Sequence, residues 1–88
     1  MEQSAPNPMN PRTTLRFSLP RPGHVTLRIF DIRGGLVRTL VNDDLAKGAH
    51  VIVWDGHTAT GQSVASGVYN YRLEALGKHL SRRLIVLK

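Results

Sequence analysis

The chain has 88 residues, a formal net charge of +6 and no cysteine. A chain this short forms one domain and buries only about 60% of the surface that its unfolded form exposes, so a large substrate cleft between two lobes is excluded. The lack of cysteine excludes disulfides, thiolate catalysis and cysteine-based zinc sites. No apolar run approaches the roughly 20 residues of a membrane helix, so we expect no transmembrane segment.

The positive charge alone could attract nucleic acid or an anionic membrane. The basic residues are scattered along the chain, however, and only Arg82 and Arg83 are adjacent among the arginines and lysines. The few aromatic residues fall in strand-like positions that suit a core rather than a platform for base stacking. We therefore expect a solvated basic surface and no nucleic-acid partner.

The first twelve residues contain three of the five prolines, Pro6, Pro8 and Pro11. Because proline fixes φ and biases the preceding residue to extended geometry, residues 1–12 are predicted to be a semi-stiff linker. They lack the basic start and apolar stretch of a signal peptide. We expect a folded domain over 13–88 that follows a passenger domain upstream, with any export signal further upstream still.

Alternation of apolar and polar residues, with turn residues between the runs, predicts short half-buried strands. The expected strands cover 13–19, 24–30, 36–41, 49–55, 68–75 and 80–87, and a short seventh strand could lie at 62–64. Residues 42–48 are predicted to be a loop, and the apolar end of the last strand to be buried on both faces. The fold class is therefore all-β, an antiparallel immunoglobulin or fibronectin-III-like sandwich of six to seven strands.

The stretch "WDGHTATGQSVASG" at 54–67 separates two of these strands. Trp54 is expected to cap one end of the core, Asp55 to form an Asx-turn, and Gly56 and Gly61 to permit sharp bends. Gly67 suggests a bulge or a close backbone approach at the start of the next strand. In that strand the side chains of Tyr69 and Tyr71 are expected to point inward. Each residue has a structural task, so the stretch is interpreted as a connector.

A catalytic interpretation of the same stretch has less support. The candidate bases are Asp55 and His57, and the candidate nucleophiles are Thr58, Thr60, Ser63 and Ser66. A nucleophile needs a base within hydrogen-bond reach and a third group that orients the base, and no G-x-S-x-G elbow is present. We therefore expect no enzyme.

Metal and cofactor sites are also not indicated. His24, His50, His57 and His79 show no ligand spacing, and Asp43, Asp44 and Asp55 lack the spaced acidic pattern of an EF-hand loop. "RGG" at 33–35 lacks the glycine spacing of a phosphate loop. We expect no metal, no cofactor and no catalytic residue.

Several blocks of the chain, in order, resemble the FlgD-like immunoglobulin domain. They are "NPMNPRTTLRFSLP", "VTLRIFDIRGGLVRTL", "KGAHVIVWDGHTATGQSVASGVYNYRL" and "RRLIVLK", and together they cover about 7–88. The most specific signature lies in Trp54, Asp55, Gly56, Gly61, Gly67, Tyr69 and Tyr71. The family is related to the C-terminal sorting tails of type IX secretion substrates, although the full WDG loop is more typical of the FlgD-like branch.

The resemblance implies a non-catalytic module at the C-terminus of a secreted bacterial protein. As a type IX-like sorting or surface-attachment domain, it would be monomeric, would reach the cell surface or medium through the periplasm, and would contact the outer-membrane secretion machinery. The residues expected to make that contact are Arg82, Arg83 and Lys88, with the edge of the last hairpin offering backbone groups for β-augmentation.

Two other functions stay open at this point. One is an assembly module of the FlgD hook-capping type. The other is a carbohydrate-binding accessory module, which would need coplanar exposed aromatics, whereas Trp54, Tyr69 and Tyr71 are expected to point inward.

Overall fold

The computed structural model describes residues 12–87, so the proposed linker lies almost entirely outside the described residues. The described part contains six strands and no helix that could cross a membrane. The strands are β1 (Thr13–Leu19), β2 (Gly23–Asp31), β3 (Leu36–Leu45), β4 (Gly48–Trp54), β5 (Gly67–Ala75) and β6 (Lys78–Val86).

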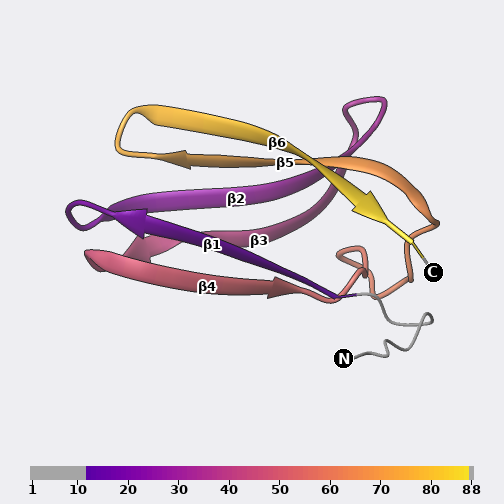
Figure 1. The fold of residues 1–88 in the computed structure, drawn as a ribbon, viewed down its shortest axis with the longest axis horizontal. Coiled ribbons are helices and arrows are strands. Elements are labelled where there is room, and N and C mark those ends of the chain that lie inside the picture. Colours follow the sequence, from indigo (N-terminus) through magenta and orange to yellow (C-terminus); the bar gives the residue numbers. More distant parts are fainter. Residues whose placement is uncertain (1–11, 88) are drawn as a thin grey trace.

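The strands form two antiparallel sheets (Figure 1). β1 pairs with β4, and the other four follow the order β3-β2-β5-β6. This confirms the predicted antiparallel sandwich of immunoglobulin type. Among the described strands only β2 and β5 have neighbours on both sides, so β1, β3, β4 and β6 each have one edge without a described neighbour.

The core lies between the two sheets and follows the predicted period-two pattern. Val25, Leu27 and Ile29 of β2 are almost fully buried, while the residues between them lie on the outer face of the four-stranded sheet. The other buried apolar residues are Leu15, Leu19, Val41, Trp54, Val64, Tyr69 and Val86. Burial of these side chains is the main source of stability in a chain that has no cysteine and, over residues 12–87, no cluster of side chains that could hold a metal ion.

The prediction of a loop over 42–48 is wrong for the first half of that range, because β3 continues to Leu45. Its last residues pair with the start of β2, in a register that ends with Gly23 opposite Leu45. The His24 imidazole lies 2.8 Å from a carboxylate oxygen of Asp44 and 2.8 Å from the amide oxygen of Asn42. The backbone ladder and this cross-strand bonding hold polar residues in a strand that their low β-propensity disfavours.

The last strand also differs from the prediction. β6 begins at Lys78 and ends at Val86, and its apolar end is not buried on both faces. Val86 lies in the core, whereas Ile85 is 62% exposed and Leu87 77% exposed. In the described part, β6 is an edge strand: residues 78–83 are all exposed, and burial alternates with exposure only over residues 84–86.

Two other expectations concern the pairing of strands. Register shifts lie between β2 and β3, beside Arg28 and Phe30, rather than at Gly67, which starts β5 opposite Val86 in an unshifted ladder. The suggested seventh strand is reduced to an isolated bridge between His57 and Ser63.

Phe30, which the pattern places on the polar side, is half-buried on the outer face of the four-stranded sheet.

Candidate functional site

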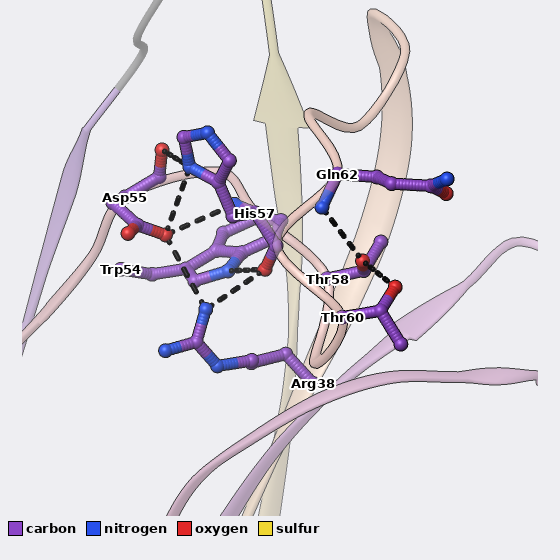
Figure 2. A network of polar contacts seen from close by, with 7 residues as sticks. All are labelled: Arg38, Trp54, Asp55, His57, Thr58, Thr60 and Gln62. Atoms are coloured by element: carbon purple, nitrogen blue, oxygen red, sulfur yellow. Dashed lines mark hydrogen bonds and ion pairs between the residues drawn. The ribbon is translucent and has the colours of Figure 1, made fainter.

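The loop from Trp54 to Val64 is organised around one backbone carbonyl, that of His57 (Figure 2). The indole Nε1 of Trp54 donates to this oxygen at 3.0 Å, and Nη1 of Arg38 donates to it at 3.1 Å. Trp54 is only 1% exposed, so its N–H group needs an internal acceptor. The loop supplies that acceptor, and β3 supplies the arginine that shares it.

Asp55 forms the predicted Asx-turn. Its Oδ1 accepts a hydrogen bond from the backbone N–H of His57 at 3.0 Å, and Gly56 between them has a φ of 79°. The same oxygen lies 3.3 Å from Nδ1 of His57 and 3.4 Å from Nη1 of Arg38. Partial burial raises the pKa of Asp55, but the backbone hydrogen bond and the charges of His57 and Arg38 outweigh it, so the pKa is lowered.

The second half of the loop is a tight turn closed by its own polar groups. The backbone N–H of Thr58 donates to the carbonyl of Gln62 at 2.8 Å, and that of Gly61 to the carbonyl of Thr58 at 3.0 Å. The Thr58 hydroxyl accepts from the N–H of Gln62 at 3.2 Å and lies 3.1 Å from the hydroxyl of Thr60. Gly61 has a φ of 88°, which explains the glycine at this position.

The ends of the loop are tied to the core. The N–H of Val64 donates to the carbonyl of Gly56 at 2.9 Å, and the Val64 side chain is buried. Tyr69 packs edge-to-face on Trp54 with ring centroids 6.0 Å apart, and its hydroxyl donates to the carbonyl of Ala65 at 2.7 Å. Tyr71 is half-buried and packs against the same core. The signature residues thus fix the loop to the core.

The candidate base His57 and the candidate nucleophiles Thr58 and Thr60 have partners within the loop. Nδ1 of His57 faces the carbonyl and carboxylate of Asp55, at 3.1 Å and 3.3 Å. The hydroxyls of Thr58 and Thr60 bond to one another, and that of Thr58 also accepts from the backbone N–H of Gln62. Across residues 12–87, no group of three His, Asp or Glu side chains gathers in a geometry that could hold a metal ion. The geometry gives these polar groups structural partners.

The residues expected to contact the secretion machinery lie apart from this loop. Arg82 and Arg83 are on the edge strand β6, opposite Tyr71 and Asn70 of β5, and as neighbours in a strand they point to opposite faces. Lys88 lies outside the described residues. The three residues do not make one described cluster.

Two features were missed by the sequence analysis. Arg38 received no role, and no local motif marks it, because its partners lie 17 and 19 residues away in the chain. The exposed apolar side chains on the outer faces, including Val51 and Ile85, were also missed. Strict alternation from the buried Trp54 and Val86 would have placed both on the outside.

Comparison with known proteins identifies the domain type. The family model described as FlgD Ig-like domain matches residues 10–78. Basal-body rod modification protein FlgD of Salmonella typhimurium (strain LT2) is 41% identical over 51 residues, which is 58% of this chain and 22% of that protein. The Escherichia coli (strain K12) protein of the same name is 37% identical over 51 residues, with the same coverage. The chain therefore spans about a fifth of the length of these relatives.

A solved structure, that of FlgD from P. aeruginosa, has the same fold. Its TM-score is 0.67 at 21% sequence identity, with 83% of this chain and 58% of that chain covered. The matched family is described as an Ig-like domain, which agrees with the expectation of a non-catalytic module. The resemblance seen in the sequence is thereby confirmed, and the chain belongs to the FlgD Ig-like domain family.

Proposed function

We propose that this domain is an assembly module of the FlgD type, which holds the protein that contains it in a larger bacterial structure through protein–protein contacts. The observation that carries the proposal is a contrast in how the polar and apolar groups are used. The loop around His57 bonds its polar groups internally, while apolar side chains such as Ile85, at 62% exposed, stand on the outside of the sandwich. A partner protein would cover such side chains, whereas a reaction would not use them.

The family match supports this proposal over type IX sorting. The relatives are named for modification of the basal-body rod. The sorting role, with its export route and its contact through Arg82, Arg83 and Lys88, has weaker support. The carbohydrate-binding alternative is disfavoured because Trp54 and Tyr69 are buried and cannot form a sugar platform.

Deletion of the domain in its own bacterium separates assembly from sorting. Residues 13–86 would be removed in frame from the chromosomal gene, with a second copy of the intact gene as the complementation control. An assembly module predicts that the shortened protein reaches its usual compartment but that the basal-body structures seen by electron microscopy are missing or incomplete. Normal structures, or retention of the shortened protein inside the cell, would contradict the proposal, and retention would favour sorting.

A further inference from the structure

The outer face of the four-stranded sheet carries an exposed apolar pair at one end. Val68 of β5 and Ile85 of β6 lie directly opposite one another in the ladder, and both are exposed. Leu87, two residues after Ile85, is also exposed. Cross-strand pairs of β-branched residues stabilise a sheet, but these two leave much of their apolar area in water.

Arginines adjoin this pair in the next rows of the sheet. Phe30 of β2 lies opposite Asn70 of β5, and Asn70 lies opposite Arg83 of β6. Arg72 follows two residues after Asn70, on the same face. We name this surface the outer-face patch; its residues are Phe30, Val68, Asn70, Arg72, Arg83 and Ile85.

Arginines outnumber carboxylates around the patch, with Arg28, Arg33, Arg72 and Arg83 against Asp31 and Glu74. Glu74 is shared by two arginines, with its oxygens 3.5 Å from Arg28 and 3.2 Å from Arg72. Arg33, in the turn after β2, and Arg83 make no ion pair within residues 12–87. Two exposed cations, Arg83 in the patch and Arg33 in the turn beside the hollow, therefore lack an ion-pair partner in the described part of the chain.

A shallow hollow of about 630 Å³ lies over the β2 and β5 part of the patch and the turn after β2, and its walls include Phe30, Asn70, Arg72 and Arg33. Asp31 also lines it, with its Oδ1 already accepting the backbone N–H groups of Arg33 and Gly35 at 2.9 Å and 2.8 Å. The guanidinium groups and the Asn70 amide in this lining offer charge-assisted hydrogen bonds to a carboxylate. Phe30 offers an apolar contact beside them.

From these observations we infer that the outer-face patch docks an acidic segment of a partner protein, one that carries apolar side chains next to its carboxylates. The inference rests on the proposed function, because that function makes the partner a protein. A second copy of this chain is a poor occupant because each copy carries a net charge of +6. A nucleic acid would need exposed aromatics for stacking, and the aromatic side chain of the patch, Phe30, is half-buried.

The open edge of β6 adds a backbone component to the same surface. Arg83 and Ile85 belong to β6, which pairs on one side only, so its outer N–H and C=O groups are free of a neighbouring strand. An extended acidic segment can therefore bond to the edge while its side chains reach the patch.

The test is an NMR titration of the ¹⁵N-labelled chain with a short synthetic peptide of alternating Glu and Val. The amides of Asn70, Arg72, Arg83 and Ile85 are expected to shift, and those of β1 and β4 to stay unchanged. A Lys-Val peptide serves as the charge control and oligo-dT as the nucleic-acid control.

Matched variants locate the binding. Arg83→Glu is expected to weaken peptide binding about fivefold and Ile85→Thr about threefold. Arg16→Glu and Val51→Thr make the same changes on the outer face of the β1–β4 sheet and are expected to change binding by less than about twofold. The melting temperature of each variant shows that it is folded.

Several results would overturn the inference. They are no peptide-dependent shifts, shifts spread over both sheets, an equal loss of binding in Arg16→Glu and Arg83→Glu, or tighter binding of oligo-dT to the same residues. The result is separable from the proposed function. If domain deletion abolishes assembly but the peptide causes no shifts, the patch is excluded as the docking site and the assembly module stands.

Discussion

The loop from Trp54 to Val64 and the outer-face patch both carry polar side chains, but these side chains find their partners in different places. In the loop, the side chains of Arg38, Asp55 and Thr58 bond to the loop itself. In the patch, Arg83 has no acidic partner within residues 12–87, and Ile85 stands largely in water. The comparison teaches that the most specific signature residues, such as Trp54, can mark the part of a domain that folds it, while the proposed docking surface lies outside them.

The comparison is tested most strongly by truncating Trp54, the centre of the loop. Trp54→Ala removes a side chain that is 1% exposed, and the His57 carbonyl loses one of its two hydrogen-bond donors. The substitution should therefore lower the free energy of unfolding by about 3–5 kcal/mol. Urea unfolding followed by circular dichroism measures the loss. Ile85→Thr is the control from the patch and should change stability by less than about 0.5 kcal/mol. Similar losses for the two variants would contradict the division of roles.

Removal of Arg38 should have a smaller effect. Arg38→Ala deletes the hydrogen bonds to the His57 carbonyl and the Asp55 carboxylate, and should cost about 1–2 kcal/mol in urea unfolding. Arg16→Ala, on the outer face of β1, is the matched control and should stay within about 0.5 kcal/mol of the parent. If Arg38→Ala behaves like the control, the arginine does not hold the loop to β3.

The two signature glycines should also differ from one another. Gly61 has a φ of 88°, so Gly61→Ala should destabilise the fold by about 1–2 kcal/mol. An added Cβ at Gly67 would meet the Tyr69 ring at an ordinary 4.0 Å, so Gly67→Ala should be within about 0.5 kcal/mol of neutral. Thermal unfolding of the two variants side by side decides this. Equal losses would mean that the turn is not what requires Gly61.

The smallest effect concerns pH. The lowered pKa of Asp55 means that its ionised form is favoured in the folded state, so its contribution is present above the ordinary value of 3.8 and is lost as pH falls through the folded pKa. Because its side chain is 53% exposed, the contribution should be below about 1 kcal/mol. Asp55→Asn should make the acid limb of the stability profile shallower, and an unchanged limb would contradict the assignment.

Much of the fold follows from local pattern. Alternation within β1 and β2 predicts their buried faces because each has a consistent apolar side toward the core. The Asx-turn at Asp55 follows from side-chain chemistry two residues apart.

What the sequence could not indicate depends on contacts made at long range. The extension of β3 through Asp43 and Asp44 requires the ladder with β2, which overrides their preference for loops. The role of Arg38 depends on the approach of β3 to the loop, and the outer-face patch depends on the order of β2, β5 and β6 in the sheet. Register and strand order decide these features, and a single strand does not encode either.

The most direct measurement combines the two patch changes in the protein that contains the domain. The double variant Arg83→Glu, Ile85→Thr should keep the melting temperature of the parent domain and lose assembly in the native bacterium, as scored by electron microscopy of basal-body structures. The matched double variant Arg16→Glu, Val51→Thr should keep both. Normal assembly by the patch variant, or an equal defect in the matched variant, would contradict the view that the loop serves the fold and the patch serves the partner.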